Sequence, residues 1–448
     1  MNRTLQKNNK KIYIRMKFYN INNPSERVSL KQAVLRSLSG SSGLYLPEQI
    51  PVLPHSFFRN LRSQDLKETA FAVSEVMLGD DIPAETLEGI IDQTFTFPIP
   101  LKQLKQNLYV LELFHGPTLA FKDVGARFMS GLFSWLVKGE DKEVTILTAT
   151  SGDTGSAVAS AFFGKSGIKV VILYPSGKVS EIQEKQLTTM GGNITALEVN
   201  GDFDDCQRLV KMAFVDDDLN SGLNLTSANS INFARLFPQS IYYFHAMAQL
   251  PGKMEPVAIS VPSGNFGNLT AGLIAKKMGL PVDKFIASCN SNHAVTDYLS
   301  SGIYVPSKTI KTISNAMDVG NPNNFPRIAE LYNKDHNDVT KDLTGYWYND
   351  DETRSGMVEL FERLGYLSDP HGAVAFLGLS EYMKRNDCTG IFIETAHPAK
   401  FLEEVESSTG VKVPVPEPLL KLKELKKQAV KIESSFSDFK EILIRRTR

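Results

Sequence analysis

The sequence predicts an α/β protein built from two parallel-sheet α/β domains, with a helical N-terminal unit in front of them. After Leu108, short β-branched and apolar runs alternate with amphipathic stretches. Continuous apolar strands that alternate with helices are typical of parallel sheets covered on both faces. The alternation falls into two blocks, and the length of 448 residues is enough for two or three domains.

The N-terminal unit is expected to be helical. Apolar residues recur at three- and four-residue spacing in residues 58–78 and 84–95, which is the period of an amphipathic helix. Pro98 and Pro100 then mark a boundary. We therefore expect an accessory domain over residues 16–105, preceded by a basic, disordered extension over residues 1–15.

The two α/β blocks supply the remaining elements. The first block predicts strands at residues 144–148, 169–174 and 194–199, with helices at 156–164, 180–190 and 205–214. The second predicts strands at 257–261, 285–289 and 390–394, with helices at 269–278 and 372–384. An amphipathic surface helix is expected over residues 419–431. We expect a small α/β domain over 131–225, inserted into a large domain made of 106–130 and 226–448.

Composition excludes several classes of function. Lys and Arg number 49 against 50 Asp and Glu, for a net charge of −1, which argues against nucleic-acid and membrane-surface partners. No apolar run approaches the roughly 18 residues that span a bilayer. The three cysteines form no CxxC pair and the seven histidines are scattered, so we expect no metal site. The same cysteine pattern predicts a cytoplasmic location. Composition does not distinguish a monomer from a homodimer.

Two glycine-rich turns lie between a predicted strand and a predicted helix. The first is Thr-Ser-Gly-Asp-Thr-Gly at residues 150–155, and the second is Ser-Gly-Asn-Phe-Gly-Asn at 263–268. A strand end, a tight turn and a helix start present unpaired N–H groups and the positive end of the helix dipole. This arrangement binds phosphate or carboxylate. Neither turn is a Walker A motif and no GxGxxG occurs, so a dinucleotide is not expected.

Lys122 is the single lysine in the apolar, small-residue segment 113–125. Burial penalises the charged form of an amine, lowers its pKa and makes it nucleophilic. A neutral amine beside two anion-binding turns is what covalent attachment of pyridoxal phosphate (PLP) requires.

These motifs resemble those of the threonine synthase family, in the fold-type II class of PLP enzymes, which is similar to the tryptophan synthase β-subunit. Residues 115–125 around Lys122 resemble the PLP-lysine motif, and residues 395–401, Thr-Ala-His-Pro-Ala-Lys-Phe, resemble a late family signature. Residues 227–232 and 315–319 also match family segments. The collinear similarity runs from Met16 almost to the C-terminus.

The resemblance implies the reaction and the cofactor. The expected reaction converts O-phospho-L-homoserine and water to L-threonine and phosphate, a PLP-dependent β,γ-replacement and the last step of threonine biosynthesis. Lys122 is expected to hold PLP and to move protons. The implied cofactor phosphate loop consists of Ser263, Gly264, Asn265, Phe266 and Gly267.

Further residues carry over from the same motifs. Thr395 is expected to face the pyridine nitrogen, and Asp153 to lie in the cofactor environment, where related enzymes commonly have Asn. The candidates for substrate binding are Thr150, Ser151, Thr154, Asn232 and Arg235. Arg235 is interpreted either as a clamp on the substrate phosphate or as part of a structural ion pair, and Lys400 as a cap of a strand–helix junction.

Two alternatives remain open from the sequence. One is another PLP-dependent lyase or dehydratase that acts on a phospho-amino acid on the same fold. The other is a non-catalytic homologue that only binds a phosphorylated ligand.

Overall fold

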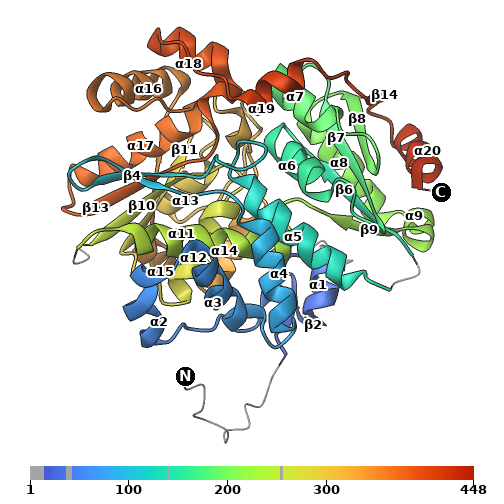
Figure 1. The fold of residues 1–448 in the computed structure, drawn as a ribbon, viewed down its shortest axis with the longest axis horizontal. Helices are drawn as coiled ribbons and strands as arrows, with labels where there is room; N and C mark the ends of the chain where they lie inside the picture. The colour runs from blue at the N-terminus through green and yellow to red at the C-terminus, as the bar shows by residue number, and fades with distance from the viewer. Residues whose placement is uncertain (1–14, 37–42, 140–141, 253–255, 448) are drawn as a thin grey trace, which may run out of the picture.

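The computed structural model describes residues 15–36, 43–139, 142–252 and 256–447 (Figure 1). The predicted extension over residues 1–15 falls almost wholly outside them. The N-terminal unit combines a small antiparallel sheet with helices. Its elements are β1 Lys17–Asn20, β2 Asn23–Ser29, α1 Leu30–Arg36, β3 Tyr45–Pro47, α2 His55–Asn60, α3 Leu66–Leu78 and α4 Ala84–Thr94.

The helical prediction for this unit is right for α3 and α4 and wrong for the three-stranded sheet β2-β1-β3. The strand β2 is mostly exposed and reads Asn-Pro-Ser-Glu-Arg-Val-Ser, so it carries no apolar alternation for a pattern search to find. Phe18 of β1 packs edge-on against Phe233, with ring centroids 4.9 Å apart. Tertiary packing therefore stabilises strands that local sequence does not favour.

The larger sheet has six strands in the order β12-β11-β10-β13-β5-β4, and only the pairing of β4 with β5 is antiparallel. Every residue of β5 and β10 is buried, as expected for strands covered on both faces. The predicted strands at 257–261, 285–289 and 390–394 are confirmed. The strands are β4 Leu101–Lys105, β5 Leu108–Glu112, β10 Val257–Pro262, β11 Lys284–Cys289, β12 Leu343–Trp347 and β13 Thr389–Glu394.

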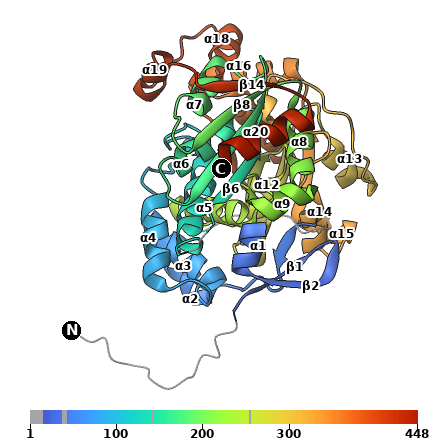
Figure 2. The same ribbon diagram turned by 90° about the vertical axis from the view of Figure 1, so that its right-hand side faces the viewer.

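The smaller sheet has five parallel strands in the order β14-β8-β7-β6-β9. The three predicted strands of the first block are confirmed as β6, β7 and β8. Figure 2 shows this side of the molecule, with β14 and helix α20 beside the smaller sheet. The strands are β6 Val144–Ala149, β7 Ile168–Pro175, β8 Ile194–Asn200, β9 Asn224–Ser227 and β14 Ala429–Glu433.

The predicted helix over residues 419–431 is wrong in its second half. Helix α19 ends at Lys423, and Ala429–Glu433 instead pairs with β8 in parallel. Lys427, just before the strand, binds the buried carboxylate of Glu198 on β8 at 2.7 Å. Ile432 and Phe439 then join the core of the smaller sheet. The leucine spacing in this segment fits a helix, but pairing with a strand far upstream in the chain decides the conformation of its second half.

Sheet membership also departs from the predicted domain boundaries. Strand β4 lies in the larger sheet, not in the accessory unit, whereas β9 and β14 lie in the smaller sheet. The prediction places β14, and the second half of β9, in the large domain over 226–448. The remaining boundaries stay a prediction.

Helices cover both sheets, and several of them begin at loops that line a pocket (Figure 1). No helix in the described part of the chain combines the length and apolarity needed to cross a bilayer. The helices that begin at or near the site are α5 Lys122–Leu136, α6 Asp153–Phe162, α7 Glu181–Thr188, α8 Phe203–Val215, α10 Phe233–Leu236, α12 Gly267–Lys277 and α17 Pro370–Met383. The others are α9 Asp217–Gly222, α11 Ser240–Gln249, α13 Ala294–Ser301, α14 Phe325–Leu331, α15 His336–Asp342, α16 Asp350–Leu364, α18 Leu402–Thr409, α19 Glu417–Lys423 and α20 Phe436–Thr447, with short 3-10 helices η1 Leu61–Ser63, η2 Phe237–Gln239, η3 Asn315–Met317 and η4 Pro398–Phe401.

Candidate active site

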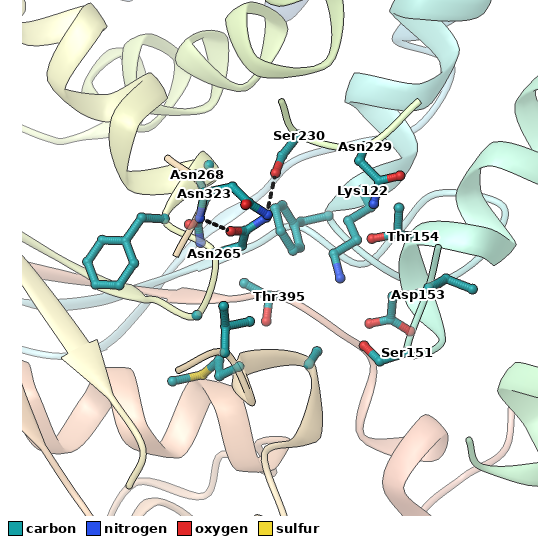
Figure 3. A pocket seen from close by; sticks show the side chains of 18 of the residues that line it. Lys122, Ser151, Asp153, Thr154, Asn229, Ser230, Asn265, Asn268, Asn323 and Thr395 are labelled. Carbon is teal, nitrogen blue, oxygen red and sulfur yellow. Dashed lines mark hydrogen bonds between the residues drawn. The ribbon is translucent and has the colours of Figure 1, made fainter. Parts of the chain in front are cut away.

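A pocket lies where loops from both sheets meet (Figure 3). The smaller sheet contributes the turn after β6, and the larger sheet contributes the turns after β10 and β13. The carboxyl ends of parallel strands are where ligands bind in open α/β sheets. Of the predicted site residues, those that line it are Lys122, Thr150, Ser151, Asp153, Thr154, Arg235, Gly264, Asn265, Phe266, Gly267 and Thr395.

Lys122 is the first residue of α5, and its side chain points into the pocket (Figure 3). Backbone pairing holds the preceding segment in place, since the Phe121 N–H donates to the Thr395 carbonyl at 2.8 Å. Burial lowers the pKa of the Lys122 amine to about 8, although the carboxylate of Asp153 acts in the opposite direction. A much larger fraction of this amine than of an ordinary lysine is therefore neutral and nucleophilic near neutral pH.

The turn at residues 150–155 leads into α6, with Gly152 at a φ of 141°. The Thr150 hydroxyl accepts from the N–H groups of Gly152 and Gly155, at 3.0 and 2.9 Å. It also donates to the Gly152 carbonyl. Thr150 therefore braces the turn, whereas the side chains of Ser151 and Thr154 face the pocket (Figure 3).

Asp153 is buried at the start of α6 and is held by two partners. Lys400 Nζ lies 2.6 Å from its Oδ1, and the Gln183 amide donates to the same oxygen at 3.0 Å. Burial alone would raise the pKa of Asp153, but Lys400 and Lys122 hold it well below its usual value. Asp153 is therefore an ionised, paired carboxylate. The interpretation of Lys400 as a simple cap is wrong, because its ammonium is buried in this ion pair.

The turn at residues 263–267 leads into α12, and Phe266 takes a left-handed conformation with φ 60°. The Asn265 amide donates to the Ser230 hydroxyl at 3.0 Å, and its Oδ1 accepts from the Asn323 N–H at 2.6 Å (Figure 3). Ser263 does not line the pocket. Its N–H donates to Ser288 and its hydroxyl to Val261, so both donors are used inside the fold.

Thr395 follows β13, and its side chain lies across the pocket from the turn after β6 (Figure 3). Thr395 is 5% exposed and lines the pocket. The neighbouring His371 accepts from the Ala316 N–H through Nε2 and contacts Asp369 through Nδ1, at 3.2 and 3.1 Å. This histidine therefore positions η3 against the pocket.

Of the two predicted substrate-binding residues Asn232 and Arg235, only Arg235 lines the pocket. Asn232 lies outside the pocket, where its amide donates to the carbonyls of Val34 and Ser227 and its oxygen caps α10. Its predicted role in substrate binding is therefore not supported by its position. Arg235 lines the pocket and is buried, with Nη1 donating to the Ala228 carbonyl at 3.0 Å and with Nε unpartnered. Among the described residues Arg235 forms no ion pair, so its interpretation as part of a structural ion pair is not supported.

Several pocket residues carry no signature in the sequence. Asn229 and Ser230 lie within the matched segment 227–232, but no strand–turn–helix pattern singles them out. Asn323 is brought in by α14 and reaches Asn265 across 58 positions. A run of polar residues beside prolines is the only signal, and such runs are typical of ordinary turns.

The pocket is suited to an anionic ligand that bonds covalently to the Lys122 amine. Its charged lining groups are Lys122, Arg235 and Asp153, and Lys400 offsets the carboxylate. The Arg235 guanidinium supplies positive charge, the start of α12 offers N–H donors, and Lys122 offers a nucleophile. These residues fit PLP, which needs donors for its phosphate and an amine for its covalent attachment. The described part of the chain holds no group of three or more His, Cys, Asp or Glu able to bind a metal ion.

Comparison with known proteins agrees with this chemistry. Residues 89–390 match the family of pyridoxal-phosphate dependent enzymes, residues 17–95 the threonine synthase N terminus, and residues 372–443 the threonine synthase C-terminal family. Threonine synthase of Haemophilus influenzae is 48% identical over 96% of this chain and 100% of its own length. The Escherichia coli enzyme is 45% identical over 96% and 99%.

Solved structures give the same result. The crystal structure of Escherichia coli threonine synthase aligns with a TM-score of 0.90 and 44% identity, covering 96% of this chain and 100% of that one. A PLP-bound threonine synthase from Brucella melitensis aligns with a TM-score of 0.89 and 34% identity, covering 97% and 100%. With these relatives and the pocket around Lys122, the chain belongs to the threonine synthase family of PLP-dependent enzymes.

Proposed function

We propose that this chain converts O-phospho-L-homoserine and water to L-threonine and inorganic phosphate. The observation that carries the proposal is the Lys122 amine, which points into a pocket bounded by two glycine turns and has its pKa lowered to about 8 by burial. The named relatives catalyse this class of reaction, and PLP is the cofactor of their family. All three cysteines are free and buried, which suits a reducing compartment such as the cytoplasm.

The residues divide the work between cofactor and substrate. When bound, PLP supplies an electron sink for negative charge that develops on the substrate carbons. Gly264, Asn265 and the start of α12 would hold its phosphate, and Ser263 would only stabilise the turn through its hydrogen bonds to Val261 and Ser288. Thr395 would meet the ring as a neutral hydroxyl, which leaves a ring nitrogen largely unprotonated. Lys122 would hold the cofactor and afterwards move protons as a neutral amine.

The turn after β6 and Arg235 would bind the substrate. Ser151 and Thr154 present hydroxyls at the N-terminal end of α6, whose dipole favours an anion. The guanidinium of Arg235 lines the pocket, is buried and has no carboxylate partner among the described residues, so its charge would attract the substrate phosphate. Charge-assisted hydrogen bonds are stronger than neutral ones.

Product analysis tests the proposal. The purified protein, with and without added PLP, is incubated with O-phospho-L-homoserine while threonine, phosphate, 2-oxobutanoate and ammonia are quantified. We expect threonine and phosphate in equal amounts, only with PLP. If 2-oxobutanoate and ammonia dominate, the chain is a lyase or dehydratase instead. A colourless protein that takes up no PLP would support a non-catalytic binding protein. Lys122→Ala is the matched control and should lose both the yellow colour and turnover.

A further inference from the structure

One buried ammonium joins three segments that lie far apart in the sequence. Lys400 Nζ lies 2.6 Å from Asp153 Oδ1 and donates to the Thr118 carbonyl at 3.0 Å. The Lys400 side chain is 0% exposed and that of Asp153 is 3% exposed. The bridge therefore links η4 beside the larger sheet, α6 beside the smaller sheet, and the loop that leads into Lys122.

The Lys122 amine faces charges from three elements. Asp153 on α6 attracts a proton to it, whereas Arg235 on α10 and Lys400 on η4 repel one. The nearby Asp123 carboxyl is not available to Lys122, because the Thr118 N–H and hydroxyl both donate to it, at 2.9 and 2.8 Å. In the described part of the chain, no hydrogen bond or ion pair of Lys122 Nζ is found.

We propose that Lys400 is a positioning residue for Lys122: by neutralising Asp153 and fixing it against the Thr118 loop, it prevents that carboxylate from pairing with the Lys122 amine. Two lysines compete for one buried carboxylate, and Lys400 holds it with direct contact. Lys122 is thereby left free to act as a nucleophile. This also accounts for a carboxylate at a position that faces the cofactor, since a carboxylate already paired with an ammonium repels an anionic ring oxygen less.

The inference rests on the proposed role of Lys122, but it can be tested without catalysis. The full-length protein, freed of PLP, is treated with formaldehyde and cyanoborohydride across a pH series, and methylation of the Lys122 peptide is quantified by mass spectrometry. The pH midpoint reports the neutral fraction of that amine. The variants are Lys400→Met, Asp153→Asn, the double variant, Lys400→Arg, and Lys412→Met as a control at an exposed lysine paired with Glu406.

The two single variants should move the midpoint in opposite directions. Lys400→Met should raise it by about one pH unit or more, so that Lys122 is labelled about tenfold more slowly at pH 7. Asp153→Asn should lower it, the double variant should lie near the unaltered protein, and Lys400→Arg and Lys412→Met should leave it unchanged. Opposite signs with near cancellation would not arise from a merely structural role.

Two outcomes would overturn the proposal: both singles moving the midpoint the same way, or neither moving it. Since Lys400→Met leaves a buried carboxylate unpaired and can impair folding, the comparison of Asp153→Asn with the double variant provides an independent test. There no carboxylate remains to pair with Lys122, so loss of Lys400 should raise the midpoint by less than Lys400→Met does when Asp153 is present, and an equal rise would mean that Asp153 has no part in the effect. If the unaltered protein forms no threonine while the midpoints shift as expected, the proposed function is contradicted and this inference still stands.

Discussion

Glu394 occupies the space where a side chain on Gly372 would lie. An ideal Cβ at Gly372 would fall 1.7 Å from Glu394 Oε2, a distance that no real carbon contact allows. The glycine near the start of α17 is therefore explained by the carboxyl group at the end of β13, and not by a backbone conformation.

This relationship predicts a coupled pair of substitutions. Gly372→Ala should lower the free energy of unfolding by about 1–3 kcal/mol, because it overpacks a buried site. In a Glu394→Ala background the same change should cost less, since the carboxyl is gone and the Ser368 hydroxyl, 2.6 Å from the ideal Cβ, loses its Glu394 partner and can rotate away. Urea unfolding of the four proteins measures the coupling, and equal costs in both backgrounds would contradict it.

Glu394 itself should make stability depend on pH. Burial and the neighbouring Asp369 hold its pKa well above the usual 4.5. The folded chain therefore keeps a proton that the unfolded chain releases, and stability falls as the pH rises from about 4.5 toward the folded pKa.

Glu394→Gln removes that titration. Relative to the unaltered protein, it should gain up to roughly 1.4 kcal/mol for each pH unit within that window. The Ser368 hydroxyl, which donates to Oε2 at 2.7 Å, can accept from the new amide instead. Urea unfolding at pH 5 and pH 8 provides the measurement, with the exposed Glu403→Gln as the control. A difference that does not grow with pH would mean that Glu394 is ionised in the fold.

Gly264 is expected to be intolerant of substitution for a different reason. A Cβ there would lie 2.4 Å from the Met317 Cα, so the turn after β10 or the backbone of η3 would have to shift. Gly264→Ala should weaken PLP binding about tenfold, measured from visible absorbance at increasing PLP. Gly89→Ala is the matched control, because nothing lies within 4 Å of its ideal Cβ on α4. That change should leave PLP binding intact and stabilise the fold by about 0.5–1 kcal/mol.

Arg235 should determine substrate affinity more than cofactor binding. Arg235→Gln removes the charge and the Nη1 donor to the Ala228 carbonyl, because the glutamine side chain ends near the position of the arginine Nε. We expect KM for O-phospho-L-homoserine to rise about 10- to 100-fold, the worth of a charge-assisted hydrogen bond. The PLP absorbance should stay the same, and Arg208→Gln on the exposed face of α8 should change neither. An unchanged KM would indicate that Arg235 only supports the Ala228 segment.

The strands that local sequence predicted are those with continuous apolar runs. Strands β6, β7, β8, β10, β11 and β13 are buried almost throughout, and their composition alone demands a two-sided cover. The strands β2 and β14 have no such composition. Strand β2 pairs with its neighbour β1, but its exposed polar residues show no strand pattern. Strand β14 pairs with β8 far upstream in the chain, where Lys427 binds Glu198, and no local pattern encodes that pairing.

The residues of the candidate site could likewise be predicted only in part from the sequence. Lys122 and the two glycine turns could be found from sequence because their chemistry needs particular residue types beside particular elements. Ser263, Asn232 and Thr150 lie in the same motifs, yet their polar groups are used largely inside the fold. Whether a polar side chain faces a ligand or its own backbone depends on orientation, which spacing does not specify.

The sequence by itself determined the α/β class, the nucleophilic lysine and the phosphate-binding turns, because each follows from local composition and from the order of the elements. Only the tertiary structure decided that Lys400 neutralises Asp153, that Glu394 requires a glycine at position 372, and that Arg235 is buried with no ion pair to any described residue. The physical reason is that charge and volume in a buried site are balanced among residues 22 to 247 positions apart, over distances of a few ångströms that folding alone establishes.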